Sequence, residues 1–440
     1  MRIRMVGHAS VILYTPAGGI LCDPWLKGKA FNESWSLRPD PSFDDSLYDG
    51  IDYIWISHEH PDHFSVATLR DLDAAFKERV TVLFQQKNST KLFDAMRRWG
   101  YKNFQSLPDR AAIELPGGVT ISCYQIGFLD SLLAVADGEH IVFNLNDTDV
   151  TVRDLASLRR QFGKPDVVLN QFSIAGFDGY KDAPKALAAS ARSKLGDMLA
   201  AHRSLGAKCT IPFASFVYFS SIDNKFINTH ANSIRDVVEA FEAEGLETQV
   251  LYPGDEWIPG TARDSGPAID RLQCAFETTG SAHFDTPAKI SIGELEAAFN
   301  NFYNSLRQYY PKFLLKRIGK LRWRLADANA VVATDFTQGR FYVDSLDGGA
   351  DIDVYSQPLH FGLSTPFGFE TLAVSVRFHV QENRRRWRFL KAISILYNQG
   401  VYLRPRYLLS GTTLGYIAER LCNNLIGQIL LKRQQRQAMN

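Results

Sequence analysis

Short apolar runs alternate with turns and with stretches of helical spacing through the first 260 residues. Residues 2–15 and 18–24 are predicted as strands joined at the turn "PAGG". The apolar run "IDYIWIS" at 51–57 is typical of a strand buried on both faces, and a helical pattern follows at 64–78. Further strands are expected at 80–85, 119–125, 132–138, 140–147 and 207–215, and helices at 89–100, 183–206 and 232–245. This order predicts an α/β domain built from two halves.

The pattern changes after this region. Residues 259–270 are rich in Pro, Gly and polar side chains, which indicates a domain boundary. We therefore predict a first domain at 1–262, a helical linker region at 263–330 and a small α+β domain at 331–440. The last domain is expected to end in an amphipathic helix with a basic tip, either packed on the protein or serving a membrane surface or a partner.

Composition and charge exclude several classes of protein. Forty-nine basic and 48 acidic residues give a net charge of +1, so no nucleic-acid partner is expected. Five scattered cysteines suggest neither a disulfide framework nor a zinc ribbon, which favours a reducing cytoplasm. The amino terminus lacks the apolar segment of a signal peptide, and no stretch is long and apolar enough to span a bilayer.

The strongest chemical signal is "ISHEHPDH" at 56–63, which holds three of the ten histidines of the chain. His58 and His60 follow a buried strand, where side chains two residues apart share one side. Asp62 and His63 enter the turn before the next helix. Imidazole and carboxylate ligands at the carboxyl end of a strand suit Zn, Fe or Mn, so we expect a metal site here.

Asp147 is a second candidate, because it ends the apolar strand "IVFNLND". A carboxylate in this position can bridge two metal ions that lie roughly 3.5–4 Å apart. The alternative is a helix cap or a turn residue, since Asp favours both.

The motif H-x-H-x-D-H after a buried strand resembles the metallo-β-lactamase-fold proteins, and "VGHAS" with "LCDPWL" resembles their lactonase-like branch. The resemblance implies an αββα sandwich with a dinuclear metal cleft at one edge, over roughly residues 1–260. It also implies that His58 and His60 bind one metal, that Asp62 and His63 bind the other, and that Asp147 bridges them. No catalytic residue beyond the metal ligands is implied.

The chain departs from that family pattern at two ligands. The family has a further histidine before the bridging aspartate, but no histidine lies between His63 and His140. Gln125 and Asp130 occupy that stretch, and Asp130 is the tentative replacement. A later family histidine is also missing, and His230 is the nearest substitute, with a helix cap or a surface position as its alternative. Oxygen-richer coordination favours iron or manganese over zinc.

Three segments carry a narrower resemblance, to the CMP-N-acetylneuraminate hydroxylase family: 210–236, 128–149 and 358–378. It implies an iron-dependent monooxygenase that hydroxylates an unactivated carbon of a CMP-sugar or a natural product. That family also carries a Rieske domain, whose Cys-x-His and Cys-x-x-His pairs are absent from this sequence. An external reductase would then supply the electrons.

Two softer candidates surround the cluster. His8, in "VGHAS", is expected to hold a metal ligand by a hydrogen bond, with a strand-end core histidine as its alternative. Asp23, in "CDPW", is expected to close a turn beside the cleft.

Two functions remain open. The first is a diiron oxygenase with O₂ as co-substrate and a small-molecule substrate. The second is a zinc-type hydrolase of a lactone, ester or phosphodiester, which the intact H-x-H-x-D-H motif favours.

Overall fold

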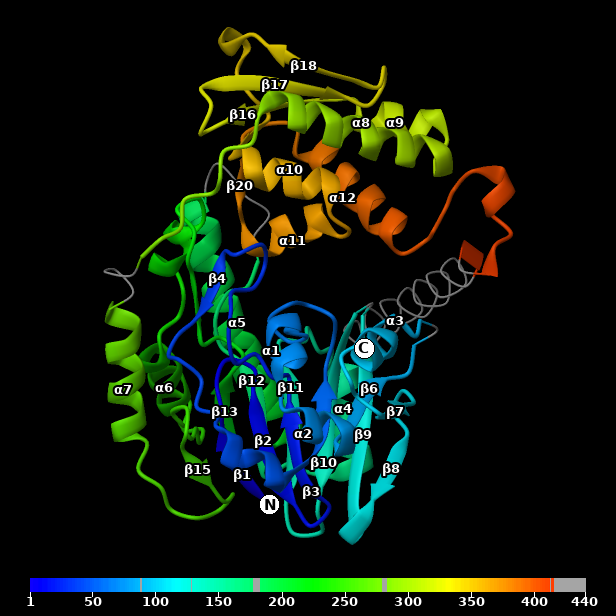
Figure 1. Cartoon of the computed structure of the whole chain (residues 1–440). Coiled ribbons are helices and arrows are strands. Elements are labelled where there is room, and N and C mark those ends of the chain that lie inside the picture. Colours follow the sequence, from blue (N-terminus) through cyan, green and yellow to red (C-terminus); the bar gives the residue numbers. More distant parts are fainter. Residues whose placement is uncertain (88, 128, 177–182, 279–282, 412, 415–440) are drawn as a thin grey trace, which may run out of the picture. The chain divides into compact units, whose positions relative to one another are not determined.

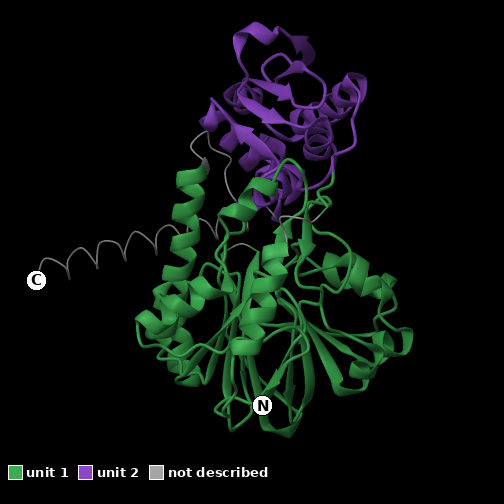
Figure 2. Cartoon of the chain, turned by 90° about the vertical axis from the view of Figure 1, so that its left-hand side faces the viewer, with its two compact units in different colours: residues 1–175, 182–285 green, residues 176–181, 286–440 purple. Residues whose placement is uncertain are grey.

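The chain folds into two compact units, each with most of its contacts inside itself, which Figure 2 colours separately. The computed structural model describes residues 1–440 except 88, 128, 177–182, 279–282, 412 and 415–440. The first unit comprises 1–175 and 182–285, and the second comprises 176–181 and 286–440. The predicted boundary at 262 precedes a helix that belongs to the first unit.

The first sheet of the first unit has seven strands (Figure 1). Across the sheet they are β15 (Glu256–Trp257), β1 (Arg2–Met5), β2 (Val11–Thr15), β3 (Gly18–Cys22), β5 (Ile51–Ile56), β6 (Thr81–Gln85) and β7 (Asn103–Leu107). The strands from β3 to β7 run parallel, so their carboxyl ends meet at one edge.

The second sheet has six strands. They are β13 (Cys209–Phe213), β12 (Val167–Gln171), β11 (Ile141–Asn146), β10 (Asp130–Ala136), β9 (Val119–Ile126) and β8 (Ala112–Leu115). β11, β12 and β13 are parallel, whereas β10 is antiparallel to β11. A two-stranded ribbon joins β4 (Trp35–Leu37) to β14 (Val217–Phe219).

The main core lies between the two sheets. Trp55 and Leu83 of the first sheet belong to one buried cluster with Leu133 and Leu169 of the second. Helices α6 (Ile234–Ala243) and α7 (Gly266–Glu277) add apolar side chains to the same cluster. Removing these surfaces from water is the main driving force for stacking the sheets.

Helices cover both outer faces. Side chains of α1 (Val66–Asp71), α2 (Ala74–Arg79) and α3 (Lys91–Arg98) pack with Ile54, Val82 and other outer residues of the first sheet. Side chains of α4 (Val152–Phe162) and α5 (Ala183–Leu205) pack with Phe143 and Val168 of the second. These layers confirm the predicted αββα sandwich.

Two predicted elements are each divided. The strand expected at 2–15 is interrupted by a turn, in which the amide of Val6 donates to the carbonyl of Ser10. The helix expected at 64–78 breaks between α1 and α2, because the Asp73 side chain accepts from the amide of Phe76 and caps a new helix. The first change matters for the site, since it places His8 in a loop.

The second unit is a smaller α+β domain, as predicted. Its sheet has the order β18 (Arg340–Asp344), β17 (Ala330–Asp335), β16 (Lys320–Leu325), β19 (Ile352–Val354) and β20 (Phe378–Val380). Its helices are α8 (Ile292–Tyr309), α9 (Lys312–Ile318), α10 (Ser356–Ser364), α11 (Gly368–Ser375) and α12 (Arg384–Asn398). Trp323, Phe369 and Trp387 lie in its core.

The predicted C-terminal helix can be compared with the structure only up to residue 414. From residue 415 onward, the predicted amphipathic helix lies outside the described residues. Within the described part, no helix has the length and apolar character needed to cross a bilayer.

Two glycine-to-alanine substitutions, one of them a control, test the close contact between β3 and the residue before β5. A Cβ added at Gly19 would lie 2.3 Å from the carbonyl oxygen of Gly50, whereas one added at Gly196 of α5 would meet no heavy atom within 4 Å. We expect Gly19→Ala to lower the free energy of unfolding by ~1–3 kcal/mol. The control Gly196→Ala should raise it by ~0.5–1 kcal/mol. Urea titrations measure both, and an unchanged midpoint for Gly19→Ala would contradict the contact.

Candidate metal centre

The candidate ligands come from strand ends of both sheets. Residues 57–63 follow β5, and Asp147 follows β11. Asp130 begins β10, which pairs antiparallel with β11 from Leu133 opposite Asn144, so the start of β10 lies near the end of β11. Sheet pairing therefore brings a residue from the start of one strand to the end of its neighbour.

Three groups of side chains could each hold a metal ion. In the first group, His58 Nε2 lies 2.8 Å from His60 Nδ1 and 3.9 Å from Asp130 Oδ1. In the second, Asp147 Oδ2 lies 3.9 Å from His58 Nε2 and 3.4 Å from His63 Nε2. These two groups share His58, so they form one continuous centre.

The third group connects to the second through His63. Asp62 Oδ2 lies 3.4 Å from His63 Nε2 and 3.2 Å from His8 Nε2. His8 is buried, and its ring also makes an edge contact with Trp25. The structure thus brings the six candidates near the motif together with His8. His230 ends the short 3₁₀ helix Lys225–Thr229 and belongs to none of the three groups.

Several ring nitrogens and carboxylate oxygens of this centre are buried without a hydrogen-bond partner among the described residues. They are His60 Nε2, Asp62 Oδ1, His63 Nε2 and Asp147 Oδ1. Buried polar atoms in folded proteins are nearly always satisfied, and leaving them unsatisfied is costly. His63 Nε2 faces Oδ2 of both Asp62 and Asp147, so a cation there would satisfy it, and the residues present fit a metal site.

The protonation preferences also suit metal ligands. Burial, together with the neighbouring His63, holds the pKa of His58 well below its usual range, so its ring is neutral. Burial opposes ionisation of Asp147, yet His63 and His58 outweigh it and lower the pKa of that carboxyl. Metals bind neutral imidazole and ionised carboxylate, so both groups are in the required form.

Asp130 behaves differently from Asp147. Burial and the neighbouring Asp147 raise the pKa of its carboxyl to about 6. Two carboxylates of like charge near each other cannot both ionise cheaply without a cation. A bound metal ion would remove this conflict.

A buried network behind the ligands holds them in place. Asp23 accepts from the Ser57 amide and the Ser57 hydroxyl, both at 2.7 Å, and from Asn146 Nδ2 at 2.7 Å. Its Oδ2 also lies 3.0 Å from His63 Nδ1. Asp23 and Asn146 both have positive φ values, 41° and 58°, a conformation that Asp and Asn tolerate better than most residues. The network joins β3 and β5 of one sheet to β11 of the other.

Two more side chains hold the loop after β5. The carbonyl of Ser57 accepts from Gln85 Nε2 at 2.9 Å and from Ser131 Oγ at 2.6 Å. Sequence reasoning missed Ser57, Asn146, Gln85 and Ser131. Ser57 and Asn146 each directly precede a candidate ligand, which is the one signal that could have identified them.

An apolar side chain lies beside the centre. The Phe31 ring centroid is 5.8 Å from that of His60, and the side chain is buried. Phe31, Asn32 and Glu33 have consecutive φ values of 51°, 57° and 60°. Three left-handed residues in a row are costly, and such strain clusters at functional sites.

The family comparison covers the region that carries this centre. Residues 2–153 match the beta-lactamase superfamily domain. This segment contains all of the grouped side chains, from His8 to Asp147. The resemblance to metallo-β-lactamase-fold proteins is therefore confirmed.

Curated relatives extend further along the chain. A Mycobacterium tuberculosis protein named for a Rieske 2Fe-2S iron–sulfur centre is 29% identical over 299 residues, which cover 62% of this chain and 55% of that protein. The match thus spans about half the length of this relative. The cytidine monophosphate-N-acetylneuraminic acid hydroxylase of Danio rerio is 25% identical over 416 residues, covering 88% of this chain and 67% of the hydroxylase.

Among solved structures of similar chains, some are named as hydrolases and others as hydroxylases. An isothiocyanate hydrolase from Delia radicum gut bacteria aligns with a TM-score of 0.45 and 17% identity, over 59% of this chain and all of that chain. CmlA, a diiron beta-hydroxylase from Streptomyces venezuelae, aligns with a TM-score of 0.40 and 14% identity, over 58% of this chain and 53% of that chain.

The support from Asp23 can be tested without changing a candidate ligand. We expect Asp23→Ala to weaken metal binding roughly 10–100-fold, because His63 and the Ser57 loop lose the carboxylate that orients them. Competition with a chromogenic chelator measures the affinity. Asp44→Asn, at an exposed 3₁₀-helix cap, is the control and should bind as the wild type does. Unchanged affinity in a folded Asp23→Ala variant would refute the positioning role.

Proposed function

We propose that the chain is a nonheme diiron monooxygenase that hydroxylates an unactivated carbon of a mid-sized substrate. The main support is the relationship with the Danio rerio hydroxylase, which spans 88% of this chain and therefore includes residues of both units. The carboxylate-rich centre is consistent with this proposal, in which Asp130 would replace a histidine of the metallo-β-lactamase-fold pattern. Oxygen ligands shift preference away from zinc.

The proposed ligands divide between two ions. His58, His60 and Asp130 would hold one ion, and Asp62 with His63 would hold the other. Asp147 would bridge them, because its Oδ2 lies 3.9 Å from His58 Nε2 and 3.4 Å from His63 Nε2. A pair of iron ions bound there would supply the activation of dioxygen.

The surrounding residues have three tasks in this mechanism. Asp23 orients His63 from behind, and His8 holds Asp62 by a contact of 3.2 Å. The buried Phe31 ring excludes water on the side of His60. A dry, preorganised site of this kind protects reactive species from side reactions.

The electrons would come from another protein or from a separate reductase domain. None of the five cysteines of the sequence lies in a Cys-x-His or Cys-x-x-His pair, the ligand pattern of a Rieske cluster. The mycobacterial relative is named for such a cluster. We therefore propose an external Rieske-type or flavin reductase as partner, and a CMP-sugar or natural product as substrate.

A hydrolase is the second candidate, and the intact H-x-H-x-D-H motif favours it. With zinc, the same centre would supply water activation near neutral pH for attack on a lactone, ester or phosphodiester.

Metal content distinguishes the two candidates. Protein purified from iron-supplemented medium should carry about two iron ions per chain. His60→Ala and Asp62→Ala should each lose about one of them. Elemental analysis with ultraviolet–visible spectroscopy is the measurement, and His283→Ala, an exposed histidine outside the three groups, is the control. Two zinc ions together with esterase or phosphodiesterase turnover would reverse the ranking.

Substitution of Asp130 tests the metal preference directly. We expect Asp130→His to raise the zinc-to-iron ratio roughly tenfold, because an imidazole replaces an oxygen ligand. Asp130→Asn separates the loss of charge from the gain of imidazole, and it should lose metal without favouring zinc. If the Asp130→His ratio equals that of the wild type, Asp130 is not a ligand.

A further inference from the structure

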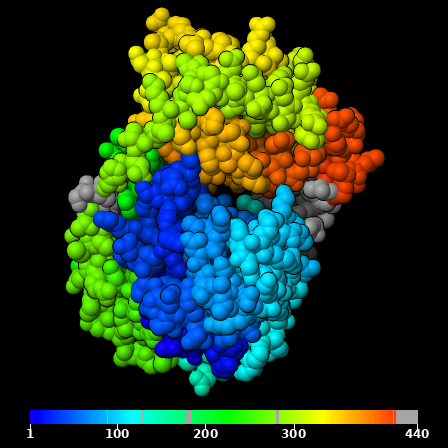
Figure 3. Space-filling view, viewed as in Figure 1, coloured from blue at the N-terminus to red at the C-terminus, as the bar shows by residue number. Residues whose placement is uncertain are grey.

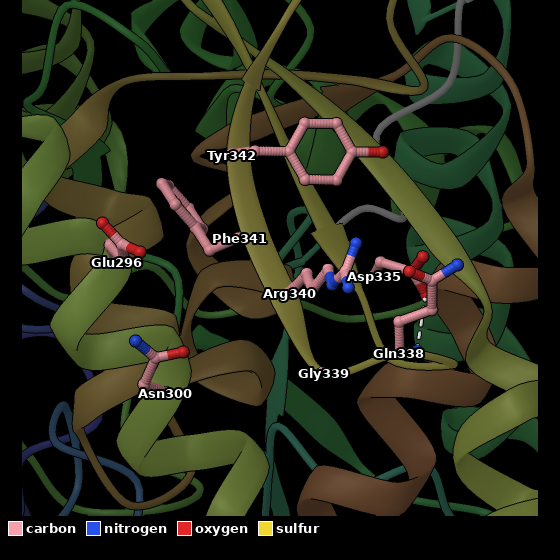
Figure 4. A pocket seen from close by; sticks show the side chains of 8 residues that line it. All are labelled: Glu296, Asn300, Asp335, Gln338, Gly339, Arg340, Phe341 and Tyr342. Atoms are coloured by element: carbon pink, nitrogen blue, oxygen red, sulfur yellow. Dashed lines mark hydrogen bonds between the residues drawn. The ribbon is translucent and has the colours of Figure 1, made fainter.

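Two neighbouring hollows lie in the second unit, between α8 and the hairpin of β17 and β18. The first has a volume of about 570 Å³ and reaches the start of α9. The second, of about 490 Å³, is shown in Figure 4, where Glu296 and Asn300 stand on the helix and the other six residues on the hairpin. Asn300, Gln338 and Gly339 line both hollows, so the two are continuous.

The first hollow has charge of one sign only. Its charged lining residues are Arg307, Lys312 and Arg404, with no carboxylate. Among the described residues, none of these three cations forms an ion pair, although Arg404 Nε donates to the Tyr310 carbonyl at 3.4 Å. By contrast, Lys320 and Arg322 of the same unit both pair with Asp344. The concavity therefore carries net positive charge, which attracts an anion.

The turn between β17 and β18, which forms part of the lining, is held in place by hydrogen bonds and by packing. The amides of Thr337 and Gln338 donate to Asp335 Oδ1 at 2.7 and 3.1 Å, which fixes the hairpin turn. Gly339 has a φ of 73°, and a Cβ there would lie 2.3 Å from the Tyr303 ring. Glycine therefore lets the buried Tyr303 pack directly beneath the turn, where it lines the hollow.

We propose that the first hollow binds the phosphate groups of a small phosphorylated molecule. Arginine and lysine at one concavity, with the side-chain amides of Asn300 and Asn304 and the hydroxyl of Thr337 beside them, match phosphate oxygens in charge and hydrogen bonding. A hollow of this volume suits a small ligand, within the range of ordinary ligand pockets. Its helices α8 and α9 lie at the surface in Figure 3. The lining residues Arg307 and Lys312 are exposed, so a ligand reaches them from solvent.

The second hollow would accommodate the rest of the ligand. Glu296 and Asp335 line it beside Arg340, so it combines carboxylate acceptors with a cation. All lining residues belong to the second unit, so the site includes none of the candidate metal ligands.

Isothermal titration calorimetry with inorganic pyrophosphate on the full-length, metal-loaded protein tests the proposal. We expect binding that weakens at least about tenfold in the double variant Arg307→Gln/Lys312→Gln and that falls with added salt. The charge-retaining variant Arg307→Lys/Lys312→Arg should bind within about threefold of the wild type. Lys289→Gln, an exposed lysine of the same unit outside both hollows, should change affinity less than about twofold.

Two outcomes would overturn the proposal. One is pyrophosphate binding that survives the double substitution in a protein whose circular dichroism and melting temperature are unchanged, which would locate the anion elsewhere, for example at the metal centre. The other is no binding of pyrophosphate by the wild type, including the case in which a short oligonucleotide or anionic vesicles bind instead.

Discussion

The two sheets of the first unit meet at one buried carboxylate, that of Asp23. An ionised carboxylate away from water is costly unless hydrogen bonds satisfy it, and here three donors from Ser57 and Asn146 do so. These donors follow or end strands of different sheets, so satisfying Asp23 fixes the relative position of β5 and β11. The candidate ligands directly follow both donors, and their separation depends on this contact.

The chemistry of the centre follows from that arrangement. The partly buried carboxyl groups of Asp130 and Asp147 repel each other when both are ionised and no cation lies between them. Burial and this repulsion raise the pKa of Asp130 to about 6. Burial, with the neighbouring His63, lowers the pKa of His58, and His63 and His58 keep Asp147 ionised despite its burial. These two side chains are therefore in the metal-binding form before a metal arrives, whereas the neighbouring carboxylates outweigh burial and raise the pKa of His63, which must release a proton when a metal binds.

In the second unit, the cations of β16 and the cations of the first hollow differ in whether they form ion pairs. All three charged side chains of β16 are paired with carboxylates, but Arg307, Lys312 and Arg404 lie together at one concavity. The chain as a whole is almost neutral, with a net charge of +1, so overall charge gives no hint of this site. Local placement decides where positive charge accumulates, because screening confines exposed charges to short range.

The sequence by itself indicated an α/β domain and, through its resemblance to metallo-β-lactamase-fold proteins, the αββα class. It indicated the four candidate ligands His58, His60, Asp62 and His63, since their spacing within one turn keeps them close together. It also indicated Asp147, at the end of an apolar strand. Only the tertiary structure placed Asp130 beside His58, because that contact depends on the register of β10 against β11. Ser57 and Asn146 likewise acquire their roles from contact with Asp23, which is distant in sequence. Residues close in sequence lie close in space because the chain connects them. Contacts between residues on different strands depend on strand register and on how the sheets pack.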